Sequence, residues 1–176
     1  MPAVRPRAAP SATAPVYVDF DDAFPELHAA AYRAGYRLLG NREAAADVAQ
    51  EACARALDRW RSVGGQSYTV AWVVRVATNL AIGQWRKQQR RDKLDPRDLV
   101  HDAFRAEHPV GDRLDLHRAL AKLSKRQREV VLLRYVADLP EAEVAAALGC
   151  SAGSVKTHAS RGLAALRAEL GDRTEP

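Results

Sequence analysis

Cysteine is nearly absent from this sequence. Its two cysteines, Cys53 and Cys150, stand far apart, with no CxxC pair and no histidine cluster beside either. This spacing argues against a disulfide scaffold and against a zinc module, and it fits a reducing compartment. We therefore expect a cytoplasmic protein with no bound metal and no cofactor.

Residues that favour strands are also scarce. Aromatic residues make up 6% of the chain, Ile82 is its single isoleucine, and the 47% of hydrophobic residues is dominated by alanine, leucine and valine. Such a composition favours helix over sheet, and no segment shows convincing alternation of apolar and polar residues. The sequence therefore predicts an all-α fold.

Long uninterrupted hydrophobic runs are missing as well. The most apolar window, 68–85, carries Arg75 and Asn79 near its middle, and an arginine at the centre of a membrane helix costs about 2.5–3.5 kcal/mol. No apolar run follows Arg5 and Arg7, so the N-terminus does not resemble a signal peptide. We expect no membrane insertion.

Sequence patterns of catalysis are lacking too. The five histidines are scattered along the chain, and the sequence contains no glycine-rich phosphate loop, nucleophile motif or metal-ligand cluster. We expect no catalytic residues, and an enzyme is the least favoured class of function.

The net charge of the chain is +5, but its positive and negative residues are distributed unevenly along the sequence. Residues 19–58 hold four cations and eight anions, whereas residues 59–91 hold seven cations and no anion. A segment of this length without a carboxylate is hard to assign to an ordinary solvated surface, so it predicts a polyanionic partner. The alternative is a basic helix that its charge merely keeps soluble.

Proline, glycine and polar clusters divide the chain into segments. Residues 1–18 contain four prolines and no regular spacing of apolar residues, which predicts a disordered tail. A first helical domain is expected over 19–93, and a flexible linker over 94–112. Apolar residues resume helical spacing in a second domain, 113–171. The expected architecture is two small helical domains joined by a linker.

Capping residues mark where individual helices begin and end. Gly40 ends the first helix and Asn41 caps the second. In the second domain, Ser124 and Gln127 have the spacing of a capping box. Three helices are expected in the first domain, over about 21–39, 41–60 and 68–91.

A helix-turn-helix is the most specific local pattern. A short helix over 141–148 ends at Gly149, which suits a sharp left-handed turn, and Ser151 caps the helix that follows. The outer face of that second helix is small, polar and basic, as in a recognition helix lying in the major groove. The alternative is a plain helical hairpin with a solvated outer face. The residues expected on the outer face are Gly153, Lys156, Thr157, Ser160 and Arg161.

The basic segment also contains all three tryptophans of the chain. Aromatic rings between cations offer stacking faces for unpaired bases, worth about 1–3 kcal/mol each, and a glycine-containing loop over 62–69 could form a pocket for an extruded base. The alternative for each ring is core packing. Trp72 lies in an apolar run, whereas Trp85, next to Arg86 and Lys87, is less easily buried.

These segments, in this order, resemble the extracytoplasmic-function (ECF) group of bacterial RNA polymerase sigma factors over about residues 19–170. The stretch 46–51 is similar to the family's core-binding helix, and the stretch 72–87 to its promoter-melting helix. Residues 123–135 and 154–161 are similar to the helix before the helix-turn-helix and to the −35 recognition helix. The resemblance implies a transcription initiation factor with no chemistry of its own.

The resemblance also implies partners and site residues. The partners would be core RNA polymerase, single-stranded −10 DNA and duplex −35 DNA, together with an anti-sigma factor, since ECF-like proteins are often held by one. The implied polymerase contacts are Asp47, Gln50 and Glu51; those to the −10 element are Asn79, Arg75, Trp72, Tyr68, Trp85, Arg86 and Lys87; those to the −35 element are Ser151, Gly153, Ser154, Lys156, Thr157, Ser160 and Arg161.

A rival interpretation is a stand-alone helix-turn-helix repressor or activator. It explains the second domain equally well. It does not explain an acidic helix followed by a basic aromatic helix in the first domain, so binding to core polymerase separates the two interpretations.

Overall fold

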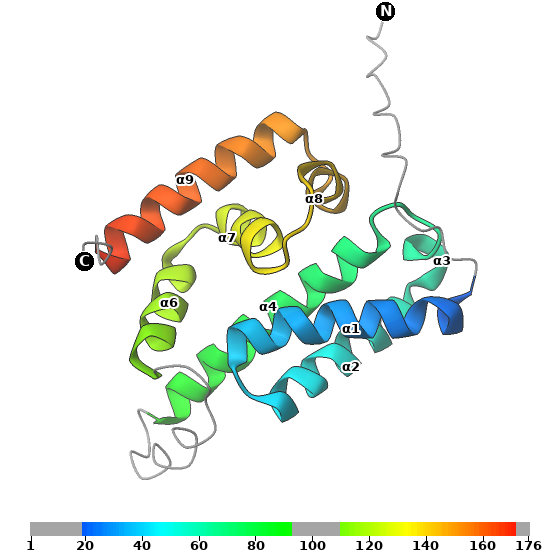
Figure 1. The fold of residues 1–176 in the computed structure, drawn as a ribbon, viewed down its shortest axis with the longest axis horizontal. Helices are drawn as coiled ribbons and strands as arrows, with labels where there is room; N and C mark the ends of the chain where they lie inside the picture. Colours follow the sequence, from blue (N-terminus) through cyan, green and yellow to red (C-terminus); the bar gives the residue numbers. More distant parts are fainter. Residues whose placement is uncertain (1–18, 93–109, 172–176) are drawn as a thin grey trace, which may run out of the picture.

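The structure, a computed structural model, describes residues 19–92 and 110–171, and within them every regular element is a helix (Figure 1). The predicted all-α fold is confirmed for these residues. The predicted tail, 1–18, and most of the predicted linker, 94–112, lie outside them. The end of that linker range belongs to a helix that begins at Val110.

The first domain is a bundle of three long helices and one short turn. Its long helices α1, α2 and α4 enclose a core in which Leu27, Val48 and Val73 are fully buried among many alanines. The small alanine side chains let the helices approach closely. The second helix ends two residues before the predicted Trp60, which instead begins a separate turn. The elements are α1 (Phe20–Leu39), α2 (Arg42–Asp58), α3 (Trp60–Val63) and α4 (Thr69–Asp92).

The second domain consists of shorter helices that end in the predicted helix-turn-helix. The helix after the capping box widens into a π-helical segment at its C-terminal end, and α8 and α9 follow as the two helices of the motif. The elements are α6 (Val110–Lys122), α7 (Lys125–Val131), η3 (Leu132–Val136), α8 (Glu141–Leu148) and α9 (Ala152–Leu170).

The helix caps follow the sequence closely. Gly40 takes a φ of 61°, and the Asn41 side chain accepts a hydrogen bond from the Ala44 amide at 2.9 Å. Ser124 and Gln127 form the complete capping box. Gly149 has a φ of 63°, and the Ser151 hydroxyl accepts from the Ser154 amide at 3.1 Å. These predictions are confirmed because each cap depends only on residues close in sequence.

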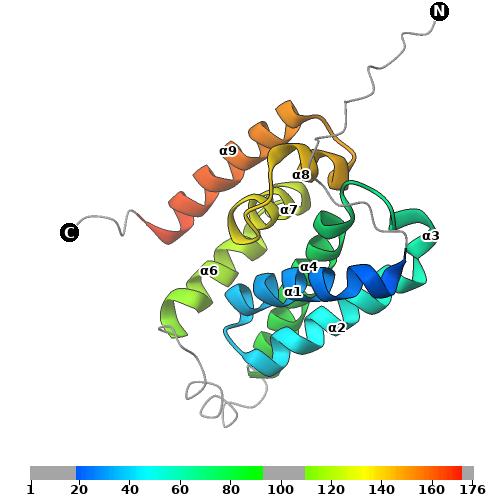
Figure 2. The same ribbon diagram turned by 45° about the vertical axis from the view of Figure 1, so that its right-hand side comes forward.

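The two domains are in contact rather than apart. Figures 1 and 2 both show α7 and α8 lying beside α1 and α4. One buried cluster joins Ala34 and Val74 of the first domain to Val130 and Leu133 of the second. A neighbouring cluster joins α1 and α4 to α6, α7 and α9 in the same way. The domains therefore share apolar cores, an arrangement that we call the closed arrangement.

Candidate nucleic-acid interface

The second helix of the helix-turn-helix presents a polar face to solvent. Its apolar residues Val155, Ala159 and Leu166 are buried against the domain. Gly162 lies so close to α7 that a Cβ atom there would come within 2.7 Å of Val131 Cγ2. The close packing fixes the rotation of α9, and the exposed face consists of Ser151, Gly153, Lys156, Thr157, Ser160 and Arg161.

Side chains on and beside this face form hydrogen bonds within α9 and one ion pair with α8. Ser154 is half-buried, and its hydroxyl shares a hydrogen bond of 2.9 Å with the Ser151 hydroxyl. Thr157 donates from its hydroxyl to the Gly153 carbonyl oxygen at 2.9 Å. Lys156 lies 3.8 Å from the Glu141 carboxylate, an exposed and weak ion pair. Arg161 is an exposed cation in the centre of α9.

The predicted −10 residues fall largely on one stripe of α4. Trp72, Arg75, Asn79 and Arg86 lie within about 60° of one another on a helical wheel. The Arg59 guanidinium lies 5.9 Å from the centre of the Trp72 ring, a cation–π arrangement. Trp72 and Asn79 are half-buried. The stripe thus combines a ring, an amide and two guanidinium groups.

Other predicted −10 residues lie off this stripe. Tyr68 is half-buried in the loop just before α4, and Lys87 is exposed near the other end of the helix. Trp85 lies about 100° from Arg86 on the wheel. Trp85 is half-buried, in keeping with the expectation that it is less easily buried, and its ring packs at 5.0 Å from the ring of His117 in the second domain. Among the described residues, its buried indole N–H has no hydrogen-bond partner.

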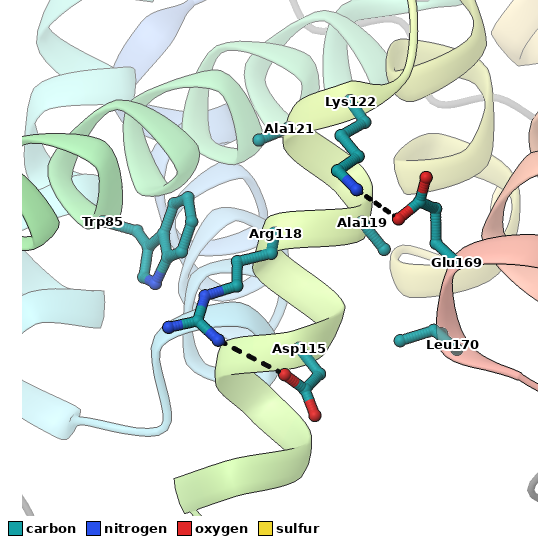
Figure 3. Close-up of a pocket in the computed structure, with 8 residues that line it drawn as sticks. All are labelled: Trp85, Asp115, Arg118, Ala119, Ala121, Lys122, Glu169 and Leu170. Carbon is teal, nitrogen blue, oxygen red and sulfur yellow. Dashed lines mark hydrogen bonds and ion pairs between the residues drawn. The ribbon is translucent and has the colours of Figure 1, made fainter.

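A pocket of about 510 Å³ lies beside Trp85, where α4, α6 and α9 meet. Figure 3 shows Arg118 extending from α6 toward the indole ring. The Arg118 guanidinium lies 3.6 Å from Asp115, and Lys122 pairs with Glu169 across the pocket rim. The pocket is a seam between the two domains, and its lining joins one aromatic ring to charged groups of both signs.

Two arginines of the α4 stripe are bonded to the second domain. The Arg75 guanidinium lies 3.0 Å from the carboxylate of Glu129, which is 1% exposed. The same guanidinium donates to the Ala147 carbonyl oxygen at 3.3 Å. Arg86 donates to the Ala121 carbonyl oxygen at 3.4 Å. In the closed arrangement these two cations are therefore occupied by protein groups.

The acidic helix α2 presents the predicted polymerase contacts on its outer side. Asp47, Gln50 and Glu51 are exposed, and their spacing of three and four residues places them on one face. Glu51 pairs with Arg55 at 2.7 Å, one turn along the same helix. The opposite face, with Val48, is buried in the core. The face is available for a partner in the closed arrangement.

Three groups have pKa values displaced by their surroundings. Burial raises the pKa of the Cys53 thiol to about 11 and raises the pKa of Glu143 above its usual range. Burial also lowers the pKa of the Arg128 guanidinium, and the nearby charge of Arg86 lowers it further. The Cys53 thiol is therefore protonated and unreactive at neutral pH.

Sequence reasoning did not identify Glu129. Its carboxylate is buried between Arg75 and Arg126, with Oε2 at 3.4 Å from the Arg126 guanidinium. The sequence offered one indication of its role. Glu129 is a single acidic residue directly before an apolar run, and the basic segment 59–91 has no carboxylate of its own with which to pair. Within 19–92 and 110–171, no group of three histidine, cysteine, aspartate or glutamate side chains is suited to hold a metal ion. Nor is any helix in those ranges long and apolar enough to cross a membrane.

Comparisons with known proteins agree with this layout. Residues 24–91 match the family model described as sigma-70 region 2, and residues 113–166 match the model described as sigma-70 region 4. The chain is 33% identical over 156 residues to the RNA polymerase sigma-E factor of Streptomyces coelicolor, with 87% of this chain and 86% of the relative covered. It is also 33% identical to the ECF RNA polymerase sigma factor SigW of Bacillus subtilis, with 80% and 83% covered.

A solved structure resembles the chain over most of its length. It is the sigma factor RpoE of Bartonella quintana in complex with the anti-sigma factor NepR. The likeness has a TM-score of 0.53 and 25% sequence identity, and it covers 86% of this chain and 96% of the solved one.

Proposed function

This chain belongs to the sigma-70 family, as an ECF sigma factor and hence a transcription initiation factor, and we propose that it joins core RNA polymerase to a two-part promoter that it helps to open. The single observation that carries the proposal is the separation of three surfaces on one chain. They are the exposed acidic face of α2, the basic aromatic stripe of α4 and the exposed polar face of α9. Each has chemistry suited to a different partner.

The acidic face of α2 is proposed to dock on core polymerase in the cytoplasm. Asp47, Gln50 and Glu51 offer two carboxylates and an amide on one exposed face, and the buried opposite face holds the helix rigid. Charged rims of this kind steer association and fix orientation. Two relatives are named as RNA polymerase sigma factors, which supports the same partner.

The stripe of α4 is proposed to bind and open the −10 element. Trp72 and Tyr68 offer faces on which unpaired bases can stack, and Asn79 can bond a base edge between Arg75 and Arg86. Trp85 and Lys87 lie off this stripe, near the C-terminal end of α4, and are proposed as further contacts to the −10 element. Contacts to unpaired bases would offset the few kcal/mol that unstacking costs.

The outer face of α9 is proposed to read the −35 duplex. The face begins at a helix N-terminus, is built of small side chains and carries Lys156 and Arg161, so the helix can lie close to base edges. The second domain is nearly balanced in charge, with nine cations and seven anions over 122–176. We therefore infer few, locally placed contacts, which linkage to the first domain makes sufficient.

An anti-sigma factor is proposed as a further partner. The support is the solved sigma factor of similar fold that is in complex with one. The polymerase-facing and DNA-facing surfaces described above are the candidate sites, because occupying either would block initiation.

Transcription in vitro tests the proposal. Core polymerase is mixed with the chain and a library of promoter fragments, and transcripts are sequenced to find their start sites. We expect starts at a shared pair of elements that appear only when both proteins are present. A chain that binds DNA specifically but neither associates with core polymerase nor yields transcripts is the rival regulator.

A further inference from the structure

We infer that the pocket between α4, α6 and α9 binds a small organic anion, in which an anionic oxygen group such as a carboxylate or a phosphate is attached to an apolar body. We call this pocket the seam pocket; it is the cavity of about 510 Å³ beside Trp85. The inference goes beyond the proposed function, which involves no small molecule, and it does not depend on that function.

The size and lining of the seam pocket suit an organic molecule rather than a lone ion. Its volume of about 510 Å³ falls in the range of about 300–1,000 Å³ that is typical of small-molecule sites. Ala119 and Leu170 share its wall with the ring of Trp85. An inorganic ion would leave this apolar surface in contact with water, whereas an apolar body would cover it.

A hydrogen-bond donor without an acceptor lies in the wall of the pocket. The indole N–H of Trp85 is buried, and no acceptor for it is found among the described residues. A buried donor that stays unpaired costs about 1–3 kcal/mol. Figure 3 shows the indole nitrogen on the edge of the ring that faces Arg118. An oxygen atom of a ligand in the pocket would remove this cost.

Arg118 brings a positive charge to the same side of the pocket. Within the described ranges its guanidinium meets one partner, the Asp115 carboxylate, at 3.6 Å, a distance too long for a good hydrogen bond. The Arg118 side chain is 61% exposed, so it can turn toward a ligand. A guanidinium can bind carboxylate or phosphate oxygens through two parallel N–H bonds. Together with the indole N–H of Trp85, it offers the donors that an anionic oxygen group requires.

Positive charge exceeds negative charge around the pocket. Arg86 donates at 3.4 Å to the carbonyl oxygen of Ala121, a residue of the lining. Burial lowers the pKa of Arg128 and the charge of Arg86 lowers it further, so these two guanidinium groups repel one another. The lining itself adds Arg118 and Lys122 against two carboxylates. A bound anion would reduce this excess of positive charge.

The carboxylates at the rim give the site a testable property. Asp115 pairs with Arg118, and Glu169 pairs with Lys122. An incoming anion has to compete with Asp115 for the Arg118 guanidinium. Removing the Asp115 carboxylate should therefore strengthen anion binding, whereas removing the guanidinium should weaken it.

The walls of the seam pocket belong to both domains. Trp85 comes from α4, Arg118 from α6 and Leu170 from α9. A ligand that touches all three contributes its full binding free energy only while the domains are together. The relative placement of the two domains would then depend on the concentration of a small molecule.

Proton–nitrogen NMR spectra of the full chain test the inference, because each of the three tryptophans gives one indole N–H signal. Trp85→Phe identifies the Trp85 signal, and Trp60 and Trp72 serve as internal controls. The anionic probes are benzoate, naphthoate and phenyl phosphate, and their neutral counterparts are benzamide, naphthamide and phenol. We expect one or more of the anions to move the Trp85 signal in a saturable manner. The matching neutral molecule should bind about threefold to tenfold more weakly.

Two substitutions with opposite expected effects test the proposed contacts. Arg118→Gln should weaken binding of the anions about threefold to tenfold and leave binding of the neutral molecules unchanged. Asp115→Asn should strengthen anion binding about twofold to threefold, since the competing charge is gone. Arg167→Gln is the matched control, because Arg167 is an exposed arginine of α9 outside the pocket lining. It should change neither.

Each outcome supports the inference or overturns it. Anions that move only the Trp85 signal support it, and a comparison of phenyl phosphate with the two carboxylates shows which oxygen group the site prefers. The inference is overturned if no probe moves that signal, if acids and neutral molecules move it equally, or if all three indole signals move together. Saturable binding of inorganic phosphate alone would show an adventitious ion only, and would also overturn it. Equal effects of Arg118→Gln and Arg167→Gln would remove Arg118 from the site. None of these measurements involves polymerase or DNA, so failure of the proposed function would be recognised separately, by the absence of transcripts.

Discussion

Gly162 of α9 lies directly against Val131 of α7, so that a Cβ atom at position 162 would come within 2.7 Å of Val131 Cγ2. Gly162→Ala should therefore destabilise the second domain by about 1–2 kcal/mol, despite the higher helix propensity of alanine. Gly83 of α4 provides the control, because nothing lies within 4 Å of a Cβ atom there. Gly83→Ala should stabilise the chain by about 0.5–1 kcal/mol. Urea unfolding checks both, and equal shifts for the two variants would contradict the close packing.

Arg161→Ala is expected to weaken binding to the −35 duplex. Arg161 is exposed at the centre of the outer face of α9, and loss of a base-edge contact costs about 1–3 kcal/mol. Arg167→Ala, an exposed cation in the last turn of the same helix, should have a smaller effect that is uniform across sequences. Footprinting and binding to mutated −35 sites distinguish the two, and an unchanged footprint with Arg161→Ala refutes the assignment.

Removing the carboxylates of α2 should weaken binding to core polymerase. Asp47→Ala combined with Glu51→Ala leaves the fold intact because both side chains are exposed, and a loss of about tenfold or more in affinity is expected if they meet cations of the polymerase. Asp21→Ala with Asp22→Ala removes two exposed carboxylates from α1 as a charge-matched control. Binding to −35 duplex should be unaffected in both. Undiminished co-purification of the α2 variant with polymerase would show that the contact lies elsewhere.

Asn79→Ala should impair promoter opening more than initial binding. A hydrogen bond from the Asn79 side-chain amide to an unpaired base cannot form while the promoter DNA is still double-stranded. Its loss costs about 0.5–1.5 kcal/mol once the DNA is open. Permanganate reactivity of unpaired thymines measures opening, and a gel-shift assay at low temperature measures initial binding. Gln84→Ala, on an exposed and different face of α4, should change neither. Equal losses in both assays for Asn79→Ala would place its role in initial binding.

The two cysteines should differ in reactivity. Cys53 is buried with its pKa raised to about 11, so at pH 8 only about one thiol in a thousand is ionised there. Cys150 is half-buried and should react first with a thiol reagent. One fast thiol per folded chain is expected, lost in Cys150→Ala, and two in denaturant. Two fast thiols in the folded chain would show that the first core opens readily.

Much of the local structure could be predicted from the sequence. Gly40, Asn41, Gly149 and Ser151 act within one turn of their own position, so their roles follow from residue type and spacing alone. The exposed outer face of α9 followed from helical periodicity in the same way. The end of α2 was placed two residues too late, because the short turn α3 continues the helical pattern after a break at Arg59.

The relation between the domains could not be predicted in this way. Trp85 is half-buried, as the cations after it suggested, but its partner is the ring of His117 in the second domain, which no local pattern indicated. Arg75 and Arg86 were expected to contact the −10 element, and no sequence pattern indicated that both donate to carbonyl oxygens of the second domain. Such contacts depend on the shapes of two apolar surfaces rather than on any short pattern.

The sequence by itself determined the helices, their caps, the helix-turn-helix and the alternation of acidic and basic segments, because these depend on neighbours within a few residues. Only the tertiary structure decided that Glu129 meets Arg75 across a separation of 54 residues, and that Arg86 of α4 bonds to a carbonyl oxygen of the second domain. The physical reason is that the sequence around a charged side chain does not show whether that side chain is solvated by water or paired with a buried carboxylate. Packing of the apolar faces of α1 and α4 against the second domain selects between the two.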